Sequence, residues 1–191
     1  MMETVEVNHA YIEEVMGKAR QAAEKFAQYD RNTTDTILKV FYEAAFNHRF
    51  RLAEMAHRES GIGKVDDKVI KNIIATRFVY YDIRDFQAAG VIIDDPLTGI
   101  TEIARPLGPV FAITPVTNPT STVLFKILIR LKTSNLLIIS PHGAARKCSI
   151  EAARICYEAA IAAGAPENCI QWLKRVSKDD VLAFMAHKKQ L

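Results

Sequence analysis

Cysteine is scarce in this chain, and its spacing fits neither a metal site nor a redox pair. Cys148, Cys156 and Cys169 are the three cysteines among 191 residues. No two of them form C-x-x-C, the spacing that zinc sites and thioredoxin-like motifs use. An unpaired thiol behaves as a small hydrophobic side chain. The sequence therefore predicts three buried free cysteines and no metal site.

A secretory start and a membrane-spanning run are also missing. Residues 1–4 (MMET) provide neither the basic segment nor the apolar segment of a signal peptide. The longest apolar stretch, near residues 123–131, is interrupted by Lys126 and Arg130. A membrane span needs about 18 consecutive apolar residues. We therefore expect a cytoplasmic protein with no membrane partner.

The chain also has no large excess of positive or negative charge. The 25 Lys and Arg residues nearly balance the 22 Asp and Glu residues, for a net charge of +3. The densest basic cluster, Lys188-Lys189, is too short for a nucleic-acid-binding tail. These charges are typical of a solvated surface, so we expect no nucleic-acid partner.

Helical spacing of apolar residues dominates residues 1–90. One stripe, Ile12–Phe26, predicts a first helix, and the polar residues 32–35 are candidates to cap a second. That second helix is predicted as one long segment over Ile37–Met55, ended by the glycines of residues 60–63. A third is predicted over residues 67–89, with a buried side formed by Val69, Ile73, Ile74, Phe78 and Tyr81.

The helical spacing of apolar residues ends at Gly90, and a strand-like pattern follows. Residues 91–93 are β-branched, residues 94–99 are rich in turn formers, and residues 100–104 read as a returning strand. The sequence thus predicts a β-hairpin over residues 91–105.

Strands and helices alternate in residues 106–191. Short apolar runs at 110–113, 135–140 and 169–173 predict buried parallel strands. Helical patterns separate and follow them, at residues 119–131, 152–163 and 179–187. Two consecutive βαβ units are typical of a doubly wound, Rossmann-like nucleotide-binding sheet. Such sheets normally have more strands, so we expect an α/β fold with an incomplete sheet, cut from a longer domain.

The loop after the first of these strands is the best candidate for chemistry. The usual G-x-G-x-x-G signature is absent, and residues 113–122 (ITPVTNPTST) stand in its place. Open α/β sheets bind ligands at the carboxyl ends of their strands. Hydroxyl and amide groups there can bind phosphate, ribose or a developing oxyanion, but they also favour a helix start. The residues alone leave both interpretations open.

A set of motifs in fixed order resembles the N-terminal part of bifunctional aldehyde-alcohol dehydrogenases. The first domain of that family is an NAD-dependent, coenzyme-A-acylating aldehyde dehydrogenase. The resemblance covers nearly the whole chain, through residues 59–63 (ESGIG), 67–72 (DKVIKN), 114–122 (TPVTNPTST), 125–126 (FK), 131–133 (LKT), 140–142 (SPH) and 163–168 (AGAPEN).

The resemblance implies specific roles for two loops. In the family, the first loop lines the NAD site, which implies that role for Ile113, Thr114, Pro115, Val116, Thr117 and Asn118. Asn118 is implied to help hold the oxyanion, because an amide N–H can stabilise charge that appears in the transition state. Ser140 and His142 are implied contacts to the adenosine side of NAD. Gly143 departs from the family, where a second proline is common, and a solvated loop histidine remains the alternative for His142.

The reaction implied by the resemblance needs a nucleophilic cysteine, an aldehyde such as acetaldehyde and coenzyme A. The family's nucleophile occurs beyond residue 191, so this chain alone is expected to be inactive. One hypothesis is the NAD-binding front half of the enzyme. A second is a non-catalytic truncated product that pairs with full-length subunits through residues 91–104, because the family assembles as oligomers through its hairpins. A third is a small stand-alone nucleotide-binding protein.

Overall fold

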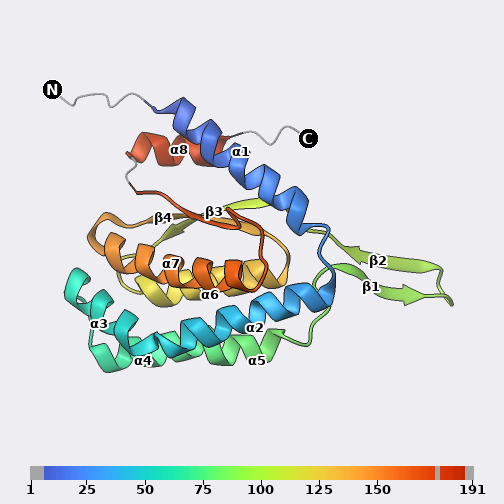
Figure 1. The fold of residues 1–191 in the computed structure, drawn as a ribbon, viewed down its shortest axis with the longest axis horizontal. Helices are drawn as coiled ribbons and strands as arrows, with labels where there is room; N and C mark the ends of the chain where they lie inside the picture. Colours follow the sequence, from blue (N-terminus) through green and yellow to red (C-terminus); the bar gives the residue numbers. More distant parts are fainter. Residues whose placement is uncertain (1–6, 175–176, 188–191) are drawn as a thin grey trace.

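A three-stranded parallel sheet lies at the centre of the computed structural model, which describes residues 7–174 and 177–187 (Figure 1). Its strands are β3 (Pro109–Thr114), β4 (Leu136–Pro141) and β5 (Ile170–Trp172), in the order β3-β4-β5. The crossover helices α6 (Pro119–Lys132) and α7 (Arg146–Ala162) cover one face. All of β4 is buried, as a continuous apolar run requires. The predicted α/β fold with two βαβ units is confirmed.

Helix α6 is buried on almost every side. It begins at Pro119, whose missing N–H is no loss in the first helical turn. The sheet and α7 cover one side of α6, and helices from the first part of the chain cover the other (Figure 1). Five of its apolar side chains are at most 1% exposed: Val123, Leu124, Ile127, Leu128 and Leu131. The helix predicted over residues 119–131 is thus present and deeply packed.

The first helices divide between two layers. Helix α1 (His9–Phe26) packs beside α8 (Lys178–Ala186) on the other face of the sheet (Figure 1). Helices α2 (Arg31–Asn47) and α3 (Arg49–Ser60) lie outside α6 and α7. Phe26, Phe41 and Leu52 belong to the same buried cluster as α6 and β4. One hydrophobic core therefore joins the helical region to the sheet.

Two predicted details of these helices are wrong. The second helix is not continuous, because the chain breaks at His48, with φ −94° and ψ 5°, and resumes as α3. The cap of α2 is Asp30 and not a residue of 32–35, since the Asp30 carboxylate accepts a 2.8 Å hydrogen bond from Thr33 N. The predicted stop is confirmed, because Gly61 follows α3 with a left-handed φ of +66°.

The predicted third helix is interrupted by a π-helical turn. Helix α4 (Val65–Ile73) continues as a π-helix, Ile74–Phe78, and then as α5 (Val79–Ile83). Val69 is buried as predicted, but the prediction is wrong for three other residues, because Ile74, Phe78 and Tyr81 are 50%, 63% and 48% exposed. Helical structure also ends at Ile83 rather than Ala89.

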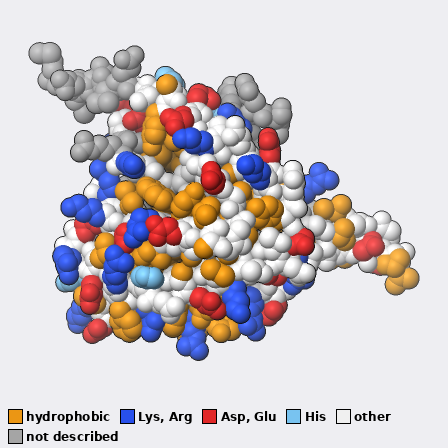
Figure 2. Space-filling model, in the orientation of Figure 1, with side chains coloured by type: hydrophobic (Ala, Val, Ile, Leu, Met, Phe, Trp, Pro, Cys, Tyr) orange, Lys and Arg blue, Asp and Glu red, His pale blue; other side chains and the backbone are white. Residues whose placement is uncertain are grey.

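The hairpin projects from the body of the protein (Figure 1). Strands β1 (Gly90–Asp95) and β2 (Ile100–Ala104) pair antiparallel, with a register shift between Val91 and Ile93. Hydrophobic side chains gather on its surface (Figure 2), and the large exposed ones are Val91, Ile92, Ile93, Leu97, Ile100 and Ile103. The predicted hairpin is present, beginning one residue earlier than expected.

The buried position of α6 gives a stability prediction. Leu124→Ala should lower the free energy of unfolding by about 2–5 kcal/mol, because it removes buried apolar atoms and leaves a cavity. Urea denaturation followed by circular dichroism measures this loss. Leu97→Ala is the matched control, since Leu97 is 96% exposed at the hairpin tip. Equal midpoints for the two variants would contradict the packing of α6.

Candidate functional site

The carboxyl ends of β3 and β4 open into a cavity of about 600 Å³. This is the edge at which doubly wound sheets bind ligands. The strand ends, the turn after β4 and the beginning of α7 form one wall, and α8 with the residue before it forms the other. The lining residues are Ile113, Thr114, Ser140, Pro141, His142, Gly143, Arg146, Leu173, Ser177, Lys178, Val181, Leu182 and Met185.

One polar atom in this cavity lacks a partner. Thr114 is 1% exposed, and its Oγ1 makes no hydrogen bond to any residue in the described part of the chain. An unsatisfied buried hydroxyl costs about 1–3 kcal/mol. The α8 wall is apolar, with Val181, Leu182 and Met185. An apolar wall with a few polar groups suits a nucleotide.

His142 lies at the rim of the cavity and shapes the turn after β4. Its Nδ1 accepts a 3.2 Å hydrogen bond from Ala144 N, which caps the 3₁₀ turn Gly143–Ala145. The imidazole is exposed. Nε2 makes no hydrogen bond within residues 7–174 and 177–187, and because Nδ1 accepts, Nε2 is the ring nitrogen that can donate at the rim.

The N-terminus of α7 is occupied by a side chain of the protein itself. Glu59, in the last turn of α3, accepts hydrogen bonds from Lys147 N at 2.8 Å and from Cys148 N at 2.7 Å. Helix N-termini favour negative charge because their first N–H groups are unpaired. Glu59 therefore fixes α3 to α7 and fills an anion site that a phosphate could otherwise use.

Asn118 lies in a second cavity, of about 380 Å³, between α6 and the π-helix. It is the residue before α6 but makes no capping hydrogen bond. Its Oδ1 instead accepts a 2.8 Å hydrogen bond from Lys71 Nζ. Its Nδ2 has no partner among the described residues, so both N–H donors stay free. Apolar side chains, including Ile74, Val79 and Phe125, line the same cavity.

Two lysines of α4 hold the loop that ends at Asn118. Lys68, only 5% exposed, donates a 3.1 Å hydrogen bond to Thr117 O, one residue before the Lys71 contact. Burial, aided by the charge of Lys71, lowers the pKa of Lys68. Helix α4 is itself fixed to α6, because Thr120 Oγ1 donates to Asn72 Oδ1 at 3.0 Å.

The predicted site residues are thus divided between two cavities. Ile113, Thr114, Ser140 and His142 line the first, and Asn118 lines the second. The loop between them runs over the surface at Pro115 and Thr117. The remaining loop residue, Val116, is partly buried against a cluster formed by Ala56, Ala145 and Cys148.

Sequence patterns did not identify Lys68, Lys71 or Arg146 as site residues. The three-residue spacing of the two lysines indicates only a shared helix face. Their contacts with residues 117–118 arise from packing between α4 and α6. Arg146 reads from the sequence as an ordinary surface residue near a helix start, and its place in the first cavity requires the fold.

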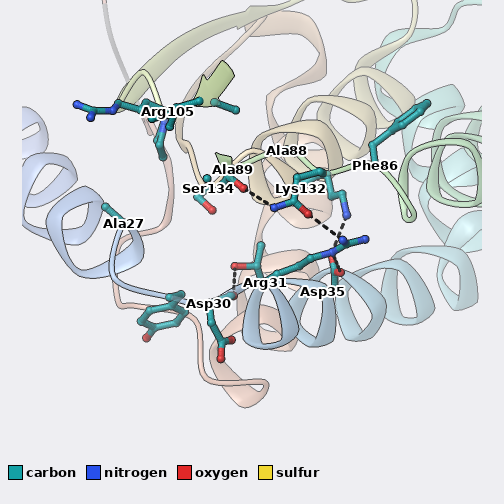
Figure 3. A pocket seen from close by; sticks show the side chains of 17 residues that line it. Ala27, Asp30, Arg31, Asp35, Phe86, Ala88, Ala89, Arg105, Lys132 and Ser134 are labelled. Atoms are coloured by element: carbon teal, nitrogen blue, oxygen red, sulfur yellow. Dashed lines mark hydrogen bonds and ion pairs between the residues drawn. The ribbon is translucent and has the colours of Figure 1, made fainter. Parts of the chain in front are cut away.

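A third cavity, of about 430 Å³, lies at the base of the hairpin (Figure 3). Lys132 Nζ binds Asp35 Oδ1 at 2.8 Å, and Arg31 Nε lies 3.3 Å from Asp35 Oδ2. Arg31 also donates to Gln87 Oε1 at 2.8 Å, in the segment that leads into β1. These bonds fix the root of the hairpin. This cavity shares no lining residue with the one at the carboxyl ends of β3 and β4, so the two are separate sites.

All three cysteines are free and buried, as predicted. Burial raises the pKa of Cys169 to about 12 and that of Cys156 well above its usual range. Burial and the neighbouring carboxyl of Glu59 raise the pKa of Cys148 to about 12. Thiolates are the nucleophilic form of cysteine. None of these thiols has an environment suited to attack on an aldehyde at neutral pH.

Two absences hold for residues 7–174 and 177–187. No group of three or more His, Cys, Asp or Glu side chains is arranged to hold a metal ion. No helix in this part of the chain is both long and apolar enough to cross a membrane.

A sequence model described as the aldehyde dehydrogenase family matches residues 1–190. The chain is 46% identical over 166 residues to aldehyde-alcohol dehydrogenase 2 of Entamoeba histolytica, covering 86% of this chain and 19% of that protein. It is 41% identical over 180 residues to the bifunctional aldehyde-alcohol dehydrogenase AdhE of Escherichia coli K12, covering 94% of this chain and 20% of that protein.

The chain belongs to the aldehyde dehydrogenase family. The resemblance to bifunctional aldehyde-alcohol dehydrogenases is confirmed. An acetylating aldehyde dehydrogenase from Geobacillus thermoglucosidasius has the same fold, with a TM-score of 0.91 at 39% identity, covering 94% of this chain and 40% of that one. An engineered glycolyl-CoA reductase with bound NADP⁺ is 26% identical, with a TM-score of 0.76, over 92% of this chain and 40% of that one. This aldehyde dehydrogenase chain thus spans about a fifth of the length of the bifunctional relatives.

Burial of the thiols gives a labelling prediction. At pH 8 the folded chain should react with Ellman's reagent only slowly, and all three thiols should react at once in urea. Because the folded thiol pKa values are raised, the unfolded state loses these protons first as pH increases. The free energy of unfolding should therefore be unaffected by the thiols below about pH 8.5 and fall from there toward pH 12. Rapid labelling of one thiol in the folded chain would contradict this assignment.

Proposed function

We propose that this chain forms the cofactor-side part of an NAD-dependent, coenzyme-A-acylating aldehyde dehydrogenase of the cytoplasm, which converts acetaldehyde to acetyl-CoA. The observation that carries the proposal is the cavity at the carboxyl edge of the sheet, lined by the ends of β3 and β4 and by the apolar side chains of α8. The names of the acetylating and bifunctional relatives support this substrate class.

The residues present fit a nicotinamide dinucleotide. Ile113, Thr114, Ser140 and His142 would hold it along the strand ends, and the apolar α8 wall suits an adenine ring. When bound, the nicotinamide supplies the acceptor for the hydride of the aldehyde. The structure with bound NADP⁺ among the relatives supports a cofactor of this class.

Asn118 is assigned to the oxyanion. Its free Nδ2 donors lie in a cavity whose apolar side chains can accept a small aldehyde. Lys71 holds Oδ1, which fixes the amide so that its N–H side, and not its carbonyl, is available. A fixed donor stabilises charge that develops on the substrate oxygen without reorganising during the reaction. We assign the nucleophilic thiol and the coenzyme A site to a part of the protein outside residues 1–191, because the three thiols here are buried and protonated.

Turnover tests this assignment. Residues 1–191 alone should produce no NADH from acetaldehyde, coenzyme A and NAD⁺. Joined in frame to the remaining part of the Geobacillus enzyme, the chain should produce NADH, and Asn118→Ala should then lower kcat by about 10²–10³-fold. Asn32→Ala, an exposed asparagine in α2, is the matched control. Turnover by the isolated chain that Cys148→Ala abolishes, or full activity of Asn118→Ala in the fusion, would refute these roles.

We also propose that the protein is a homo-oligomer that associates through residues 91–104. Contiguous exposed apolar surface on a soluble protein marks an interaction site. The hairpin has such surface, and the Arg31–Asp35–Lys132 network fixes its root, so it is presented in a defined direction (Figures 2 and 3).

Light scattering checks this interface. The double variant Ile93→Asp/Ile103→Asp should shift the chain from an oligomer toward monomer, because each charge would lose hydration in the interface. Ile62→Asp, an exposed apolar residue away from the hairpin, should leave the mass unchanged. An unaltered mass for the hairpin variant would exclude this surface as the interface.

A further inference from the structure

The polar side of α4 binds the loop that leads into α6. Residues 68, 71 and 72 share one face of α4, because positions three and four apart are neighbours on a helix. They contact residues 117, 118 and 120 in the same order along the chain. Asn72 is 0% exposed and also donates a 2.9 Å hydrogen bond to Arg49 O, which fixes α4 to α3. The loop is therefore bound to a helix that is itself held in place.

The Asn118 side chain does not make the bond that its position favours. Asn118 is the residue before α6, where an asparagine oxygen usually accepts from the first N–H groups of the helix. No such capping bond is present, and Oδ1 accepts the 2.8 Å bond from Lys71 Nζ instead. The amide is thus oriented by α4 and not by the helix that it precedes.

The charge of Lys71 acts on this amide without an acidic neighbour to neutralise it. Within residues 7–174 and 177–187, Lys71 forms no ion pair, and no Asp or Glu lines the cavity that it shares with Asn118. A cation at Oδ1 directs Nδ2 to the opposite side of the amide. It also draws electron density toward Oδ1, so the Nδ2 hydrogens become stronger donors, because linked hydrogen bonds polarise one another.

We infer that Lys71 is a positioning residue of the aldehyde reaction and that its charge acts through Asn118. The inference rests on the proposed oxyanion role of Asn118 and adds the group on which that role depends. When a thiolate adds to the aldehyde carbon, the carbonyl electron pair moves to oxygen, and the oriented Nδ2 donors stabilise that charge. Without Lys71 the amide is free to turn, either to cap α6 or to present Oδ1, which repels the oxyanion.

Steady-state kinetics of the fusion with the remaining part of the Geobacillus enzyme test the inference. Lys71→Met should lower kcat by about 10–100-fold, less than the loss of the donor itself, and should leave the KM for acetaldehyde within about twofold. Lys71→Arg should retain most of the rate, because it keeps a charged donor at Oδ1. A residue that only shaped the cavity would raise KM instead, and that result would overturn the inference.

A double-mutant cycle separates action through Asn118 from action elsewhere. Because Lys71 is inferred to act through that amide, Lys71→Met should have no further effect on kcat when Asn118 is already alanine. Two losses that multiply would show an independent role for Lys71 and would overturn the inference. Lys64→Met is the matched control and should keep full activity, because Lys64 is an exposed lysine just before α4 whose side chain makes no capping bond.

The contact itself can be measured on residues 1–191 without turnover. In a ¹H–¹⁵N spectrum, the side-chain amide signals of Asn118 are identified by their loss in Asn118→Ala. Lys71→Met should shift these signals, and Lys64→Met should leave them in place, with circular dichroism as the check that each variant is folded. Unchanged Asn118 signals in Lys71→Met would overturn the inference even if the fusion has no activity.

Failure of the inference and failure of the proposed function give different results. Full activity of Asn118→Ala would refute the proposed oxyanion role, and the inference with it. Reduced activity of Asn118→Ala together with full activity of Lys71→Met would overturn the inference alone and leave the role of Asn118 standing.

Discussion

The burial of α6 is the constraint on which both candidate cavities depend. Its apolar side chains contact the sheet on one side and the α2–α4 layer on the other. Because interiors are close-packed, a helix held on both sides has little freedom to shift. Its first residue, Pro119, therefore fixes where β3 must end and where Asn118 must lie. The same packing brings α4, and with it Lys68 and Lys71, against the loop.

The elements of the α/β part were predictable because their signals are local. The run at 135–140 can be buried on both faces only in a covered parallel sheet. The run at 110–113 forms the strand beside it, but the predicted burial is wrong for Ile113, which is 53% exposed at the open edge of the sheet. Pro119, Gly61 and the turn formers of 94–99 mark boundaries by their own backbone preferences.

The errors in the helical region have a different origin. The apolar pattern placed Ile74 and Phe78 on the buried side, but the buried face of this helix contains the polar Asn72 and Thr76, which apolar spacing alone does not identify. The candidate site was likewise predictable only in part. The loop 113–118 could be located from its place after a strand, whereas its separation into two cavities depends on α4 and α8, which are distant in sequence.

The π-helix sets the angular position of α5 about the helix axis. One residue advances an α-helix by about 100°, so a single deletion within residues 74–78 would turn α5 by about that angle. Tyr80, now stacked on Tyr42 with ring centroids 4.3 Å apart, would leave that stack. Arg84, whose carbonyl accepts from Lys132, would turn with it and weaken the root of the hairpin. The π-helix thus lies between the cavity that contains Asn118 and the root of the hairpin.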